Sequence, residues 1–175
     1  MEMPDTPTLK TERLLLRPPT EADIPKIVQY LSDLDVSGNC GTIPHPYGVK
    51  DAEFFLAKIA STNVTWAIAP TSTQHLVGVV GLSAYQGENA QAELGYWLGK
   101  PFWGQGIGFE AAEAAVEFAD NAGLDPLYAG YFDTNPGSGR ILEKLGFQEV
   151  GASMKRCAAR DGDFRSIDMI RTSAA

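Results

Sequence analysis

Three alternating glycines between a strand and a helix are the feature that most constrains this fold. Residues 93–98 predict a strand, and Gly104, Gly106 and Gly108 follow it where an Ala- and Glu-rich helix begins. Glycines let a backbone approach a ligand closely, and a helix N-terminus adds unpaired N–H donors and a positive dipole end. The turn therefore predicts a site for a phosphate-bearing ligand, with a plain glycine-rich turn as the competing interpretation.

The rest of the chain predicts one domain over residues 9–172, of mixed α/β class, with helices on both faces of one sheet. Apolar runs and turn signals predict strands over residues 9–17, 64–70, 76–85, 93–98, 127–132, 147–157 and 164–170. Helical spacing and capping residues predict helices over residues 21–33, 50–61 and 138–145, a helix from the glycines to Gly123, and a loop over 36–48.

Net charge and hydropathy limit the partners. The formal net charge of −8 disfavours nucleic acid, because a polyanion normally requires a basic patch. The acidity suits solubility or the steering of a cationic substrate such as an amine. No segment approaches the roughly 20 apolar residues that cross a membrane, so we expect no membrane partner.

The N-terminus and the cysteines predict a cytoplasmic protein. Residues 1–5 have neither the basic region nor the apolar run of a signal peptide. Cys40 and Cys157 match no metal-binding or redox spacing. We therefore expect buried or half-buried thiols in a reducing cytosol, and no metal site.

A dinucleotide-binding unit is an alternative interpretation of the same glycines. Gly106, Gly108 and Ala111 fit G-x-G-x-x-A, and Asp133 follows 22 residues later, as a ribose-binding acid would. However, residues 99–105 separate the strand from that fingerprint. Only 42 residues follow Asp133, too few for a doubly wound sheet.

Four stretches in this order resemble a known family. They are residues 9–17 (LKTERLLLR), 43–47 (IPHPY), 93–98 with 103–111 (ELGYWL and WGQGIGFEA), and Asn135 with Ser138 and 142–147 (LEKLGF). Together they are similar to the GNAT superfamily of acyl-CoA-dependent N-acetyltransferases, and specifically to its ribosomal-protein-alanine (RimJ/RimL-like) branch. The similarity covers residues 9–170.

The resemblance implies a single-domain GNAT fold of the α+β kind. Its central sheet would be mixed but mostly antiparallel, with about six to seven strands that splay apart in the middle and about four flanking helices. It also implies acetyl-CoA as the cofactor, an amine as the acceptor, and a monomer or homodimer.

The resemblance also assigns the cofactor contacts. Backbone N–H groups of the glycine turn and of the first helical turn would hold the pyrophosphate, and main-chain groups at the end of the preceding strand would bond the pantetheine arm. Asn135 and Ser138 would contact the arm as well, although Asn135 can also be a plain turn residue before Pro136. The expected main-chain contacts are Gln105, Gly106, Ile107, Gly108, Phe109 and Glu110 for the pyrophosphate, and Tyr96, Trp97 and Leu98 for the arm.

Glu93 is the first candidate for the general base that removes a proton from the acceptor amine. Period-2 alternation places it on the face of Gly95 and Trp97, and the family often uses an acid on this strand. A partly exposed strand carboxylate is the competing interpretation. Glu88 and His45 are weaker candidates for the base.

Ser138 is the candidate donor to the leaving thiolate. A thiol titrates near pH 8.5, so the leaving group needs little protonation. Leu142 stands where many family members have a tyrosine acid, and Phe109 stands where the branch usually has Thr or Ser. These departures leave open a non-catalytic acyl-CoA-binding sensor.

The acceptor is the least determined part of the site. His45, Tyr47 and Phe54 are candidate substrate contacts, although aromatic residues there can equally belong to the core. The branch favours a protein N-terminal amine, and a small-molecule amine such as an antibiotic, amino acid or polyamine is the alternative, because fold does not determine substrate.

Overall fold

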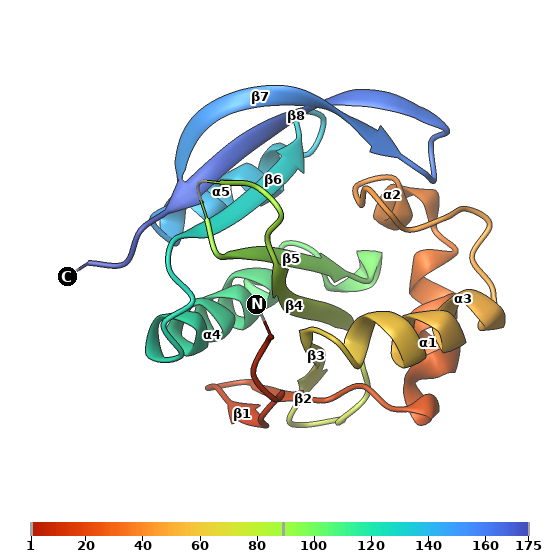
Figure 1. Cartoon of the computed structure of the whole chain (residues 1–175). Helices are drawn as coiled ribbons and strands as arrows, with labels where there is room; N and C mark the ends of the chain where they lie inside the picture. Colours follow the sequence, from red (N-terminus) through yellow and green to blue (C-terminus); the bar gives the residue numbers. More distant parts are fainter. Residues whose placement is uncertain (1, 89, 175) are drawn as a thin grey trace.

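An eight-stranded sheet runs through the molecule in the order β1-β2-β3-β4-β5-β6-β8-β7 (Figure 1). The computed structural model describes residues 2–88 and 90–174, so Met1, the first residue of the N-terminal segment considered above, lies outside them. The strands are β1 (Leu9–Lys10), β2 (Leu14–Arg17), β3 (Val64–Pro70), β4 (Gly78–Ala84), β5 (Ala92–Leu98), β6 (Leu127–Phe132), β7 (Gln148–Cys157) and β8 (Gly162–Arg171).

Five α-helices flank the sheet in the described residues, together with short 3-10 and π-helical turns. The α-helices are α1 (Ile24–Leu31), α2 (Leu34–Ser37), α3 (Val49–Phe54), α4 (Ile107–Asn121) and α5 (Pro136–Lys144). The turns are the 3-10 helices η1 (Glu21–Asp23) and η3 (Lys100–Phe102) and the π-helix η2 (Phe55–Ala60). The predicted α+β fold with a mixed, mostly antiparallel sheet is confirmed, with more strands and helices than expected.

Only β5 and β6 pair in parallel, and every other pair of neighbouring strands in the described sheet is antiparallel. A doubly wound dinucleotide-binding sheet is mostly parallel. The topology therefore excludes the dinucleotide-binding alternative.

The single strand predicted over residues 9–17 is wrong, because the chain reverses there. Strands β1 and β2 form an antiparallel hairpin in which Leu9 pairs with Leu16. The Thr11 N–H donates to the Leu14 carbonyl at 3.0 Å and closes the turn. The hairpin brings the side chain of Arg13 toward the start of α4, which bears on the site below.

Helix boundaries follow local capping chemistry. At the start of η1, the Asp23 carboxylate accepts a hydrogen bond from the Thr20 N–H at 2.8 Å. The same carboxylate forms two 2.8 Å contacts with the Arg17 guanidinium. The loop predicted over residues 36–48 is partly helical, because α2 occupies its start. Gly123 and Gly146 have φ of +71° and +89° just after α4 and α5, as expected for glycines that end helices.

The core lies on both faces of the sheet. On one face, Trp66 and Leu82 are fully or almost fully buried in a cluster with the apolar side of α4. On the other face, Ala67 and Val79 pack against α1 and α3, together with Tyr47. Because β3 contributes to both clusters, nearly all of its residues are buried, which explains its continuous apolar run.

The two cysteines are free thiols, as expected. Cys157 is buried, and its Sγ lies 3.5 Å from the Gly38 carbonyl oxygen. Burial raises the pKa of the Cys40 thiol to about 12, so this thiol stays protonated. Among the residues that the structure describes, no helix is long and apolar enough to cross a membrane.

Candidate active site

The middle of the sheet splays between β5 and β6. The two strands pair only at Ala92 with Leu127 and at Glu93 with Tyr128, whereas β4 stays paired with β5 as far as Leu98. Beyond Glu93 the strands run apart (Figure 1). Residues 94–98 therefore form an edge of β5 with no partner strand on that side among the described residues. We call this the unpaired edge of β5.

The register of β4 and β5 decides which main-chain groups point toward the unpaired edge. The Gly99 N–H donates to the Val77 carbonyl at 2.8 Å, which marks a hydrogen-bonded pair. Since such pairs alternate along an antiparallel ladder, Trp97 also faces β4, while Tyr96 and Leu98 face away from it. The expected main-chain contact from Trp97 is therefore corrected, because β4 already occupies its N–H and carbonyl.

One group at this edge is already satisfied within the protein. The Trp103 indole Nε1 donates to the Leu98 carbonyl oxygen at 2.9 Å. The N–H of Leu98 and both main-chain groups of Tyr96 remain directed away from β4. Buried main-chain groups normally have partners, so these three groups fit an extended ligand with amides, such as a pantetheine arm.

The glycine turn presents free donors, as a phosphate site requires. Gly104 and Gly106 have φ of +73° and +75°, in the left-handed region that favours glycine. The N–H groups of residues 104–109 donate no hydrogen bond to any described residue. They lie at the start of α4, a 15-residue helix whose dipole is positive at this end. The turn therefore fits the diphosphate of coenzyme A.

Glu110 differs from the other expected pyrophosphate contacts. Its N–H already donates to the Gly106 carbonyl at 3.1 Å. Its carboxylate accepts hydrogen bonds from Thr11 Oγ1 at 2.6 Å, Arg13 N at 2.8 Å and Arg13 Nε at 2.7 Å. Burial raises the pKa of Glu110, but these hydrogen bonds together lower it by a larger amount. The net pKa therefore lies below its usual value. Glu110 thus holds Arg13 rather than offering an N–H to a ligand.

Glu93 sits at the vertex of the splay. Its paired residue on β6 is Tyr128, and the Glu93 side chain is partly buried. Burial raises the pKa of the Glu93 carboxyl, Lys155 lowers it and Asp168 raises it. The net effect is an upward shift, which suits a carboxylate that accepts a proton from an amine.

A polar cluster on β6, β7 and β8, joined by Tyr85 just after β4, lies near Glu93 and was not found from the sequence. Tyr128 Oη donates to Asp168 Oδ1 at 2.6 Å, and Lys155 Nζ lies 3.1 Å from the same oxygen while also contacting Tyr128 Oη. Tyr85 stacks on Tyr128 with ring centroids 4.4 Å apart. Burial, followed by the hydrogen bond to Asp168, raises the pKa of Tyr128, so the phenol keeps its proton. Near Glu93 the cluster therefore offers a second carboxylate and two phenols to a polar ligand.

Ser138 meets a residue whose side chain the sequence did not single out. The Ser138 and Tyr96 hydroxyl oxygens lie 2.8 Å apart, so that β5 is linked to α5. Burial raises the pKa of Tyr96, and the hydrogen bond with Ser138 lowers it, for a net value of about 12. Leu142 is 1% exposed in the core, so its side chain supplies no acid. The hydroxyls available at this position belong to Tyr96 and Ser138.

Asn135 and Phe109 lie at the starts of α5 and α4. Asn135 is the N-cap residue of α5, and its side chain forms no hydrogen bond with another described residue. Phe109 is half-buried, with Lys144 Nζ 6.0 Å from its ring centroid. Both side chains thus remain available to a ligand bound along α4 and α5.

The expected acceptor contacts and the weaker base candidates fall into two groups. Tyr47 is 8% exposed and packs in the core with Ile27, which favours the alternative that this aromatic residue belongs to the core. His45, Phe54 and Glu88 are exposed, and Phe54 is 60% exposed. These three side chains can reach solvent, and the structure brings none of them into hydrogen-bond contact with Glu93.

Comparisons with known proteins agree with this geometry. The sequence profile described as "Acetyltransferase (GNAT) domain" matches residues 13–148. The uncharacterized N-acetyltransferase YoaA of Bacillus subtilis (strain 168) is 29% identical over 151 residues, which cover 83% of this chain and 85% of YoaA. The crystal structure of a GNAT-family acetyltransferase from Bacillus anthracis is similar with a TM-score of 0.82 and 23% identity, covering 95% of this chain and 98% of that one.

Two further similar proteins have names that state an acceptor or bound ligands. The [ribosomal protein uS5]-alanine N-acetyltransferase of Escherichia coli (strain K12) is 31% identical over 94 residues, which cover 53% of this chain and 48% of that protein. The microcin C7 self-immunity acetyltransferase MccE, solved in complex with acetyl-CoA and AMP, has a TM-score of 0.78 and 16% identity, with 93% of this chain and 94% of that chain covered.

Proposed function

We propose that this chain, which belongs to the GNAT family of acetyltransferases, acetylates the N-terminal amine of a protein. It is an N-acetyltransferase, and acetyl-CoA is its acyl donor. The proposal therefore concerns the acceptor and the residues that act on it.

The position of Glu93 at the vertex of the splay, where burial raises its pKa, is the observation that carries this choice. An α-amine titrates near pH 7.7–8.0 and a lysine amine near 10.4, so deprotonation at pH 7 costs about 1 kcal/mol and about 5 kcal/mol respectively. A carboxylate whose pKa is raised is a stronger base than an ordinary one, and the smaller cost of deprotonating an α-amine is the easier one for it to offset. The site therefore suits an α-amine better than an alkyl amine.

Separate residues hold the donor and act on the acceptor. The free N–H groups of residues 104–109 would hold the diphosphate, and the main-chain groups of Tyr96 and Leu98 would hold the arm. When bound, acetyl-CoA supplies an acetyl group activated as a thioester. Glu93 accepts a proton from the acceptor ammonium at its carboxylate. Tyr96 stays protonated at neutral pH, because its pKa is about 12, and its Oη can donate a hydrogen bond to a sulfur anion.

The surroundings of Glu93 support a peptide rather than a fully enclosed substrate. Lys155 and Asp168 have side chains 39% and 20% exposed, so the cluster beside Glu93 opens to solvent. A chain entering by its N-terminus could place its amine at Glu93 while the following residues stay outside. The named acceptor of the Escherichia coli relative is also a protein alanine, although that match covers about half of each chain.

A pair of matched peptides tests the proposal. One peptide has a free N-terminal alanine and an internal lysine, and the other has the same sequence with its N-terminus already acetylated. With acetyl-CoA, we expect thiol release and one added acetyl group, located by mass spectrometry at the N-terminus, for the first peptide only. Turnover with free amino acids or polyamines but with neither peptide would favour the small-molecule alternative. Tight binding of acetyl-CoA without turnover on any amine would favour the sensor.

A further inference from the structure

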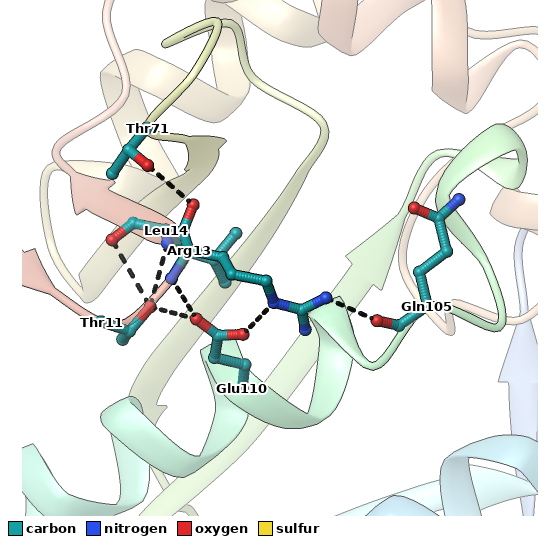
Figure 2. A network of polar contacts seen from close by, with 6 residues as sticks. All are labelled: Thr11, Arg13, Leu14, Thr71, Gln105 and Glu110. Carbon is teal, nitrogen blue, oxygen red and sulfur yellow. Dashed lines mark hydrogen bonds and ion pairs between the residues drawn. The ribbon is translucent and has the colours of Figure 1, made fainter.

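Arg13 links the β1–β2 turn to the start of α4 (Figure 2). Its Nε donates to Glu110 Oε2 at 2.7 Å, and its Nη1 donates to the Gln105 carbonyl oxygen at 2.9 Å. Its own carbonyl accepts from the Thr71 N–H at 2.9 Å and from Thr71 Oγ1 at 3.2 Å. The arginine is therefore held at its backbone and at its guanidinium, and it joins segments more than 90 residues apart in the sequence.

The contact with Gln105 fixes the orientation of one peptide group in the glycine turn. In a trans peptide the carbonyl of residue 105 and the N–H of residue 106 point in opposite directions. Since Arg13 holds the Gln105 carbonyl, the Gly106 N–H must point away from Arg13. This N–H is one of the free donors of the turn, so Arg13 determines the direction in which the Gly106 N–H points.

The turn needs such a support because its backbone is otherwise free. Gly104 and Gly106 both have positive φ, are exposed, and can adopt many other conformations at little cost. Gln105 Nε2 donates to the Pro101 carbonyl at 3.1 Å, which restrains the side chain but not the peptide group that follows it. Arg13 is the described residue whose side chain bonds to a carbonyl of this turn.

The guanidinium is not a free cation. Glu110 accepts bonds from its Nε, from the Arg13 N–H and from Thr11 Oγ1, so a carboxylate lies directly against the positive charge. A neutralised pair attracts a distant phosphate weakly. Nη2 also lies only 3.3 Å from the position that a Cβ would occupy at Gly106, so the group fills the space behind the turn.

We propose that Arg13 is a positioning residue for the binding of coenzyme A, acting through the Gln105–Gly106 peptide while Glu110 and Thr11 hold its guanidinium in place. The inference rests on the proposed binding of the diphosphate by residues 104–109. It differs from a role in which Arg13 attracts the phosphates by its own charge, and the two roles make opposite predictions for Glu110.

Titration calorimetry with coenzyme A separates the two roles. We expect Arg13→Gln and Glu110→Gln each to weaken binding by about tenfold, the size typical of a lost hydrogen bond to a charged group. The double variant should be no weaker than the weaker single variant, because both changes release the same peptide. Arg156→Gln, which removes an exposed arginine paired with Asp161 on the β7–β8 turn, is the matched control and should bind as the wild type does.

A second acyl donor and a conservative variant show whether weaker binding reflects general damage to the fold. S-acetylpantetheine lacks the diphosphate, so its kcat/KM should be the same for Arg13→Gln and the wild type. Arg13→Lys can reach Gln105 or Glu110 but lacks the planar fork that bonds both, and its affinity should fall between those of the wild type and Arg13→Gln. If Arg13→Gln does not fold, Arg13→Lys and Glu110→Gln carry the test.

Two results are decisive against the inference, and a third concerns the proposed function. Wild-type affinity for coenzyme A in Arg13→Gln would overturn it. Unchanged or tighter binding by Glu110→Gln, together with weaker binding by Arg13→Gln, would show that Arg13 acts by its charge. A wild-type protein that does not bind coenzyme A would contradict the proposed function itself, which is a distinct outcome.

Discussion

Replacement of Glu93 by Gln should separate proton removal from binding of acetyl-CoA. The amide keeps the size of the side chain but cannot accept a proton at neutral pH. General-base catalysis typically contributes about 10²–10⁴-fold, so we expect kcat at pH 7 to fall within that range. The dissociation constant for acetyl-CoA should change by less than about twofold, because Glu93 is not among the groups that face the diphosphate or the arm.

The pH dependence of this defect also identifies the acceptor. Without Glu93 only the neutral amine reacts, and for an α-amine its fraction rises from roughly a tenth at pH 7 to nearly all at pH 9. The loss in Glu93→Gln should therefore shrink by about tenfold over this interval. A lysine-type amine, with a pKa near 10.4, would instead show a rise of about a hundredfold over the same interval and no plateau by pH 9.

Steady-state thiol release between pH 6 and pH 9 measures both effects. Glu88→Gln is the matched control, because it makes the same chemical change at an exposed carboxylate of a neighbouring loop, and it should behave as the wild type. Equal kcat for Glu93→Gln and the wild type across this range would refute the assignment. A large defect in Glu88→Gln would move the base to that residue.

Thermal unfolding provides an independent check with a defined sign. The folded-state pKa of Glu93 is raised above its unfolded value of about 4.3. Below that pH the side chain is protonated in both states and does not lower the free energy of unfolding. As the pH rises through the folded pKa, the partly buried carboxylate ionises and lowers stability. Glu93→Gln should therefore have the same Tm as the wild type near pH 4 and a higher Tm at pH 7–8.

Three further substitutions test other parts of the structure. Tyr96→Phe removes the hydroxyl that bonds Ser138 and should lower kcat by about tenfold, less than the loss of an oxyanion-hole donor, with the calorimetric affinity for acetyl-CoA unchanged. Asp23→Asn leaves Arg17 without its buried partner and should cost about 3 kcal/mol in urea unfolding at pH 7. Because the folded pKa of Asp23 is lowered, this difference should disappear as the pH falls through that lowered pKa. Gly106→Val places a β-branched residue at φ +75° and should abolish coenzyme A binding, while the strain of about 1–2 kcal/mol should lower Tm by only a few degrees.

The sequence predicted most of the strands because their apolar runs come from burial that is local to each strand. The predicted strands over residues 64–70 and 127–132 coincide with β3 and β6. The reversal between β1 and β2 was missed because its turn depends on Thr11, which bonds Glu110, a residue 99 positions away in the sequence. No local pattern contains that contact.

The candidate site shows the same division between local and non-local information. The glycine turn was predicted, because its free N–H groups follow from residues that are adjacent in the sequence. The direction of the Trp97 main-chain groups was not predicted, since it depends on the register between β4 and β5. Tyr47 belongs to the core because α1 and α3 close over it, and the cluster around Tyr128 requires three strands that meet only in the folded sheet.

The limited pairing of β5 with β6 creates both the unpaired edge of β5 and the position of Glu93 beside it. If β6 paired with β5 along its whole length, it would satisfy the main-chain groups of Tyr96 and Leu98. Because pairing stops at Glu93 and Tyr128, unpaired main-chain groups and a partly buried carboxylate lie side by side, and each is a cost to the folded protein. A ligand that occupies the unpaired edge removes part of that cost, so binding and folding are linked. At a concentration 100 times its Kd, such a ligand stabilises the fold by about 2.7 kcal/mol.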